Sequence, residues 1–241
     1  PLGIGVGNTT LPEERIDVDL KLGEETKNYK LMAYEFGNNP ETTLKDQYEL
    51  VNIPGLGKKE DFAQVNVKDK VALVERGEIA FVEKIKNAKD AGAKAVIVYN
   101  SETGSNSPGP ADIFVGASFD YIPTVDMDRT QGLALKAKLE KEKVMIDFTK
   151  FNVTTTPGDD VNDSSSRGPS LPNFDIKPDV SAPGTNILST IPSFAVGDNY
   201  SKAYAQYTGT SMATPHISGV SALLKELHPE WTPFDIKSAL S

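Results

Sequence analysis

The sequence contains no cysteine among its 241 residues, and only two histidines and one tryptophan. Without cysteine, disulfide bonds, thiolate catalysis and cysteine-ligated zinc are all excluded. The longest unbroken apolar run, Ala95–Tyr99, has five residues, whereas a membrane-spanning helix needs about 20. The sequence does not open with a basic and apolar signal segment, although a chain cut from an exported precursor would lack one too.

An excess of basic residues is also missing. The formal net charge is −9, and acidic residues are spread along the whole chain. A nucleic-acid-binding protein concentrates Lys and Arg on one stretch, so nucleic acid is not an expected partner. Hydrophobic residues make up 38% of the chain, and its length allows one or two domains with a real core.

Residues 28–147 have the pattern of a compact α/β domain. The apolar runs at 70–75 and 94–99 predict two strands, and apolar residues at helical spacing over 81–88 predict a helix between them. A strand, a helix and a strand joined by short loops predict a parallel pair with a right-handed crossover.

Two more strands are expected in the same region, at 122–127 and 143–149. Asp128, with Gln131 three residues later, predicts the start of a helix between them. The Ser, Gly, Pro and Asn-rich stretch at 101–110 is expected to be a surface loop.

The remainder of the chain has a different composition. Residues 151–210 are rich in loop-forming residues, with short apolar pieces such as 186–191, and residues 4–6 form another apolar piece that needs a sheet partner. After Gly209, an apolar stripe predicts a long helix. It should end at His228, before a proline.

The stripe of this helix consists of Ile217, Val220, Leu224 and Leu227. A second helix should open at Thr232, an N-cap followed by a proline, and continue to Ser241.

Ser211 stands at the expected start of the long helix. Unpaired N–H groups and the positive end of the helix dipole surround such a position, and the serine's own N–H can face an oxyanion. A simple N-cap is the commoner role of a serine there. The hydrolase elbow Gly-x-Ser-x-Gly is disfavoured, because Ala213 replaces its second glycine and residues 204–208 predict a marginal strand at best.

Neither histidine can serve Ser211 as a base. His216, five residues on, lies roughly 140° around the helix from the serine, and His228 lies about 25 Å along its axis. The two histidines are about 18 Å apart, too far to share a metal. His216 is expected to be a buried or half-buried structural residue, and His228 a helix C-terminal residue.

The sequence GTSMATPHISG at 209–219 is very similar to the serine motif of the subtilisin-like serine proteases. Two further family segments follow the family's order, SSRGP at 165–169 and KPDVSAPG at 177–184, and residues 228–232 fit as well. The resemblance covers about residues 151–241. It implies an α/β fold with part of a three-layer, parallel-sheet catalytic domain, and a nucleophile at Ser211.

Residues 28–147 resemble the protease-associated domain, an α/β insert of large extracellular subtilases. The match is carried by GEIAF at 77–81 and KDAGAKAV at 89–96. This implies catalytic-domain segments at 1–27 and 148–241 around the insert. The overall likeness is to minor extracellular subtilases of bacilli and to cell-envelope proteinases of Gram-positive bacteria, so an extracellular or cell-envelope location in a bacterium is expected.

The family's catalytic Asp and catalytic His motifs have no counterpart in this chain. The oxyanion Asn motif has none either, because Asn8 lies in an expected Gly-Asn-Thr turn that fits the stretch after that motif. Only Ser211 carries over as catalytic, together with its N–H as one oxyanion donor, and Thr210 beside it is expected to be structural. A peptidase part that is inactive by itself is therefore implied.

Two other functions stay open. The insert could be a protein-interaction module on a non-catalytic scaffold, or the chain could belong to a pseudo-protease that lacks Asp or His. The intact serine motif argues against a scaffold, and the reading frame upstream would decide the second question.

Polypeptides are the expected substrates, and the sequence identifies no certain cofactor. Structural calcium is possible in a full-length enzyme. Asp159, Asp160 and Asp163 form an acidic loop that is expected to be a solvated turn rather than an ion site.

Overall fold

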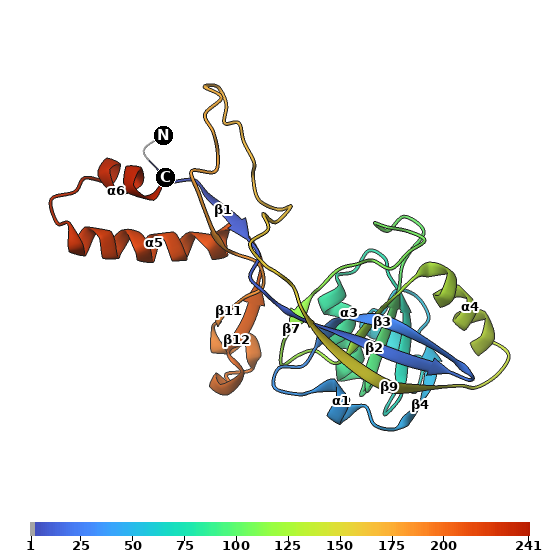
Figure 1. Cartoon of the computed structure of the whole chain (residues 1–241). Helices are drawn as coiled ribbons and strands as arrows, with labels where there is room; N and C mark the ends of the chain where they lie inside the picture. Colours follow the sequence, from blue (N-terminus) through green and yellow to red (C-terminus); the bar gives the residue numbers. More distant parts are fainter. Residues whose placement is uncertain (1–2) are drawn as a thin grey trace. The chain divides into compact units, whose positions relative to one another are not determined.

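The computed structural model describes residues 3–241, which divide into two compact units (Figure 1). The barrel unit spans Glu14–Thr154, and the serine unit combines the chain up to Glu13 with Thr155–Ser241. The mixed α/β character expected from the sequence is confirmed. Within the described residues, none of the helices is long and apolar enough to cross a bilayer.

The barrel unit is built on one mixed sheet, in the order β2-β9-β4-β5-β6-β8-β3-β7. An additional pairing of β2 with β3 closes this sheet on itself. The strands are β2 (Glu14–Leu22), β3 (Glu25–Tyr34), β4 (Gln47–Asn52), β5 (Val71–Glu75), β6 (Ala95–Tyr99), β7 (Gly116–Ala117), β8 (Thr124–Met127) and β9 (Val144–Thr155). The helices are α1 (Pro40–Thr43), α2 (Lys59–Phe62), α3 (Phe81–Asp90) and α4 (Arg129–Leu139).

The predicted strand-helix-strand unit is confirmed. β5 and β6 pair in parallel, with Leu73 opposite Ile97, and α3 lies between them in the chain. The predicted cap of α4 is also confirmed, because the Asp128 side chain accepts a hydrogen bond from the Gln131 N–H at 2.8 Å.

The expected limits of the insert, 28 and 147, fall inside β3 and β9, whereas the compact unit runs from Glu14 to Thr154. The compact unit is longer because β2 belongs to it: β2 forms a hairpin with β3, with Asp17 opposite Lys30. Ile16, Val18 and Leu20 of β2 are buried in the core of this unit.

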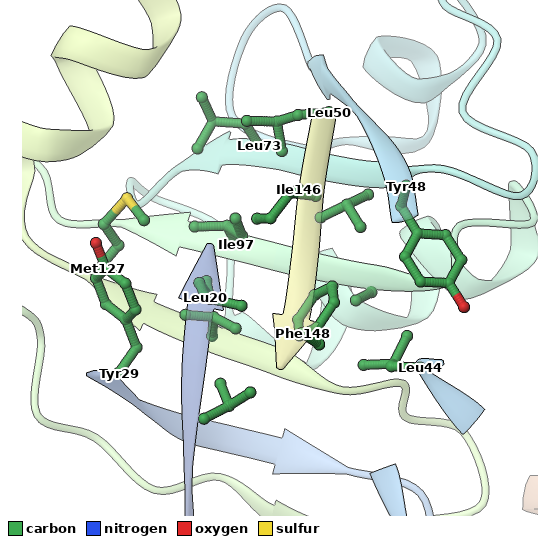
Figure 2. Close-up of a cluster of buried hydrophobic side chains, with 14 of the residues drawn as sticks. Leu20, Tyr29, Leu44, Tyr48, Leu50, Leu73, Ile97, Met127, Ile146 and Phe148 are labelled. Carbon is green, nitrogen blue, oxygen red and sulfur yellow. The ribbon is translucent and has the colours of Figure 1, made fainter. Parts of the chain in front are cut away.

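The core of the barrel unit has two parts, the first of which is drawn in Figure 2. Leu73 and Ile97 belong to the first, which Figure 2 shows together with Leu20 and Ile146. Their sequence neighbours Val74, Val96 and Val98 belong to the second, which Ile85 and Ala88 of α3 complete. Both faces of β5 and β6 are therefore buried, which explains why these strands are continuous apolar runs.

We expect residues 14–154 to fold when they are expressed alone, because they contain a closed sheet and both parts of its core. Residues 28–147 alone should be much less stable, because they lack β2, whose loss opens the sheet, removes Val18 and Leu20 from the core and exposes the core residues that these two cover. Amide spectra of the two segments test this. A dispersed spectrum for 28–147 and a collapsed one for 14–154 would contradict it.

In its described residues, the serine unit has two short sheets and two α-helices. β1 (Val6–Thr9) pairs in parallel with β10 (Val180–Pro183), and β11 (Ile187–Thr190) pairs in antiparallel fashion with β12 (Tyr204–Tyr207). Short 3₁₀ turns, η1 (Ser193–Val196) and η2 (Tyr200–Lys202), separate β11 from β12. α5 (Thr210–Leu227) and α6 (Pro233–Leu240) follow, with His228 as the C-cap of α5 and Thr232 as the N-cap of α6, as predicted.

One expectation for this unit was wrong: Asn8 is not in a turn but in β1, where it is fully buried. β1 and β11 pair with different partners and so belong to different sheets. In the apolar stripe of α5, Val220 and Leu227 are exposed. In the described part of this unit, parallel pairing is limited to β1 and β10, so these residues do not assemble a three-layer parallel sheet.

Asp179 holds both ends of the serine unit together. Its carboxylate, 13% exposed, accepts from the Lys177 Nζ at 2.7 Å and from the Gly5 N–H at 2.7 Å, and the Lys237 Nζ of α6 lies 3.3 Å away. These partners, the Lys177 ammonium first, lower the pKa of Asp179 from 3.8 to about 2.

Replacing this carboxylate should destabilise the protein in a pH-dependent way. A depressed pKa contributes stability above the unfolded value of 3.8, and this stability is lost as the pH falls toward 2. We expect Asp179→Asn to cost about 1–2 kcal/mol at pH 7. Urea unfolding should show this difference shrinking between pH 4 and pH 2. A penalty that is constant over that interval would contradict the assignment.

Candidate functional site: the start of α5

Ser211 is the second residue of α5, and its side chain is exposed. The first N–H groups of a helix have no acceptor within the helix, so the Ser211 N–H is free of the helical ladder. Among residues 3–241, no hydrogen bond to the Ser211 hydroxyl is found. The site therefore presents a hydroxyl and a backbone donor at the positive end of an 18-residue helix.

Pro215 lies inside α5 rather than in its first turn. A proline has no N–H, so the carbonyl of Ser211, four residues earlier, lacks its usual helical donor. The first turn is held by Gly209 instead, whose carbonyl accepts from the Met212 N–H at 3.0 Å and from the Ala213 N–H at 3.3 Å. Ala213 is fully buried and fixes this turn against the unit.

Gly184 fixes the entry to the helix. The Gly209 N–H donates to the Gly184 carbonyl at 2.8 Å, and the Gly184 N–H donates to the Thr9 carbonyl at 3.0 Å. A Cβ on Gly184 would lie 2.7 Å from the Gly209 carbonyl oxygen. Only glycine allows this close approach, which joins the segment at 177–184 to the serine segment.

The motif segment at 165–169 packs on the segment at 177–184 in a similar way. Gly168, at φ +65°, lies so close to Lys177 that a Cβ there would be 2.9 Å from the Lys177 carbonyl oxygen. Ser165 is buried, and its Oγ accepts from the Asn8 N–H in β1 at 3.0 Å. The three segments singled out in the sequence are thus joined within one unit.

The histidines lie where the helical geometry places them, away from the Ser211 hydroxyl. The Nδ1 atom of His216 is 3.0 Å from the Met212 carbonyl oxygen on its own helix. His228 stacks on Trp231, with ring centroids 4.0 Å apart. His216 is exposed, contrary to the expectation that it is buried or half-buried, because in this unit α5 buries Ala213 and leaves most of its other residues accessible.

The carboxylates of the acidic loop at 159–163 do not form a cluster. Asp163 pairs with Arg167 at 3.4 Å, and Asp160 contributes backbone bonds to Thr10. Within residues 3–241, no group of three or more His, Asp or Glu side chains is placed to bind a metal ion.

Sequence reasoning missed the contribution of Asn8 and Gly184 to this site. Asn8 is a fully buried polar residue in β1, and its partners lie more than 150 positions away. Because Asn8 was expected in a turn, the sequence did not mark it as a buried residue.

Comparison with known proteins identifies the family. The model of the subtilase family matches residues 70–241. The minor extracellular protease Vpr of Bacillus subtilis is 37% identical over 98% of the chain, and the subtilisin-like protease SBT5.4 of Arabidopsis thaliana is 30% identical over all of it. A C5a peptidase of Streptococcus pyogenes is 34% identical over 73% of the chain.

The chain therefore belongs to the subtilase family. It spans 28% of the length of Vpr, 32% of SBT5.4 and 14% of the C5a peptidase.

Solved structures give weaker likenesses. The subtilisin-like protease Apa1 of Pseudoalteromonas sp. AS-11 is 24% identical, with a TM-score of 0.37 over 94% of this chain and 43% of its own. An aminopeptidase from Aneurinibacillus sp. strain AM-1 is 28% identical, with a TM-score of 0.42 over 61% of this chain and 35% of its own. Because both scores are low, the family assignment rests on the sequence comparisons.

Proposed function

We propose that the chain is the serine-bearing part of a longer serine endopeptidase in which Ser211 is the nucleophile. The observation that carries the proposal is the exposed Ser211 hydroxyl at the start of α5, in a chain of the subtilase family. The described residues supply the nucleophile and one oxyanion donor, the Ser211 N–H. Thr210 supports the turn, since its carbonyl accepts from the Thr214 hydroxyl at 2.8 Å.

The base would come from another part of the longer polypeptide. His216 hydrogen-bonds its own helix, and a serine hydroxyl without a base is a weak nucleophile. Family membership makes the subtilisin mechanism the template for this proposal. In that mechanism a catalytic His held by an Asp takes the serine proton, and an Asn adds an oxyanion donor.

The reaction then has two stages. The Ser211 oxygen bonds to the carbonyl carbon of the peptide while its proton passes to the His, and the C–N bond breaks as the same proton passes to the leaving amine. Water, deprotonated by the His, then cleaves the acyl-enzyme ester and restores the hydroxyl. Throughout, the Ser211 N–H faces the developing oxyanion.

The barrel unit is proposed to be a protease-associated insert with corrected limits of 14 and 154. Its role would be to steer or block bulky polypeptide substrates. An extracellular or cell-envelope location in a bacterium is supported by the name of the extracellular protease Vpr of Bacillus subtilis. Structural calcium in the longer enzyme would be held by carboxylate and carbonyl oxygens; among the described residues no group of three or more His, Asp or Glu side chains is placed to bind an ion.

The proposal is tested with the longer protein that contains the chain. Incubated with unfolded casein in the presence of calcium, it should produce internal cleavages that a serine-directed phosphonate stops. Cleavage that resists the phosphonate would overturn the proposal. Folded protein that never cleaves casein would favour a pseudo-protease or an interaction module.

A further inference from the structure

Asn8 is a buried polar residue whose amide oxygen, amide nitrogen and backbone groups are all hydrogen-bonded. Its Oδ1 atom accepts from the Thr185 hydroxyl at 3.1 Å, and its Nδ2 donates to the Ser164 hydroxyl at 3.3 Å. Its backbone N–H donates to the Ser165 hydroxyl at 3.0 Å, and its carbonyl accepts from the Asn162 N–H at 3.0 Å. One residue of β1 therefore holds two segments that lie more than 150 positions away in the sequence.

A buried hydrogen-bond network of this kind is sensitive to the loss of any one partner. A buried amide that loses a partner costs about 1–3 kcal/mol, whereas a well-satisfied one fixes a single arrangement of its neighbours. The Thr185 hydroxyl also accepts from the Asn162 side chain at 3.1 Å. The side chains of Asn8, Thr185 and Asn162 thus form a chain of hydrogen bonds across the interior of the serine unit.

This network lies directly under the entry to α5. A Cβ on Gly184 would lie 2.6 Å from the Asn8 Oδ1 and 2.7 Å from the Gly209 carbonyl oxygen, so Gly184 is packed between the two. The Gly184 carbonyl also accepts from the Gly209 N–H. The Gly209 carbonyl in turn accepts hydrogen bonds from the Met212 and Ala213 N–H groups, which follow Ser211 in the first turn of α5.

We propose that Asn8 is a positioning residue for Ser211, a role that rests on the proposed function of that serine. The Asn8 amide fixes Thr185 and the adjacent Gly184, Gly184 fixes Gly209, and Gly209 fixes the first turn of α5. The side chain touches no reacting group. Its effect is to restrict the position of the Ser211 hydroxyl, because displacements near 1 Å at a reacting group can cost about a hundredfold in rate.

The first test is independent of activity. Hydrogen exchange is followed by mass spectrometry in the longer protein, with Ser211→Ala present in every sample to prevent self-cleavage. Asn8→Ala should accelerate exchange at least tenfold in peptides that contain the Gly184 and Gly209 amides. Thr232→Ala, which removes the N-cap of α6, is the matched control and should leave these peptides unchanged.

The second test measures the active enzyme. Asn8→Ala should lower kcat per titrated active site by ten- to a hundredfold, with KM changed less than threefold. Thr185→Val, nearly isosteric but without the hydroxyl, should lower kcat in the same direction, and Thr185→Ser should restore it. Thr232→Ala should leave kcat per active site within twofold, although it also lowers the melting temperature.

Two results would overturn the proposal. One is unchanged exchange at Gly184 and Gly209 in folded Asn8→Ala. The other is an Asn8→Ala enzyme with normal kcat per titrated site and a stability loss alone. Failure of the proposed function would look different, because the unsubstituted protein would then neither cleave casein nor take up the phosphonate, while the exchange experiment would still report on Asn8.

Discussion

Ser211→Ala is expected to abolish turnover in the longer protease while leaving its fold intact. The substitution removes the hydroxyl that would form the acyl-enzyme, and the loss in kcat should be of order 10⁶, the size known for subtilisin itself and carried over from it. The folding cost should be about 0.5 kcal/mol or less, since Ser211 is exposed and the N-cap of α5 is Gly209 rather than Ser211. Casein and peptide assays together with thermal unfolding measure both effects.

His216→Ala is the matched comparison, because the motif places this histidine beside the serine. Its ring bonds to the Met212 carbonyl oxygen on its own helix, so the variant should keep turnover per folded molecule within roughly tenfold, about 1.4 kcal/mol. If folded His216→Ala were as inactive as Ser211→Ala by active-site titration, the base would lie in this chain and the assignment would be wrong.

The isolated 241-residue chain should be inert as a peptidase. It should cleave no casein and should not be phosphonylated at Ser211, because among its described residues no side chain hydrogen-bonds the Ser211 hydroxyl and neither histidine is placed as its base. Labelling of the purified chain at neutral pH, followed by intact-mass measurement, tests this.

The control is the longer protein under the same conditions, which should gain the mass of one phosphonyl group. Stoichiometric labelling of the isolated chain would show that it activates its own serine. The proposal that the base lies elsewhere would then have to be abandoned.

Local pattern was sufficient for the elements whose residues are buried on both faces or carry a cap. β5, α3 and β6 were predicted because Val71–Glu75 and Ala95–Tyr99 are nearly unbroken apolar runs. Thr232 and Asp128 marked helix starts because their side chains accept the hydrogen bonds of N-caps.

The strands β2, β3 and β4 were missed because their pairing is long-range or their pattern is diluted by charge. In β2, Val18 and Leu20 alternate with Asp17 and Asp19, which is a strand pattern, but its place beside β9 depends on residues about 130 positions away. For this reason the expected limit at 28 falls inside β3 rather than at the start of the compact unit.

The residues of the candidate site also differ in whether local sequence reveals them. Ser211 could be selected from the sequence because a helix start and a family motif coincide there. Gly184 and Asn8 could not, because their importance lies in contacts with Gly209 and Thr185 that only the folded chain creates.

The central claim is that Ser211 is the nucleophile, and adduct mapping tests it most directly. The longer protein is treated with a peptidyl phosphonate, digested, and sequenced by tandem mass spectrometry, with Ser211→Ala in parallel. We predict one adduct, on the Ser211 oxygen, that appears as activity is lost and is absent from the variant. Phosphonate adducts on another residue, or full loss of activity with Ser211 unmodified, would contradict the claim.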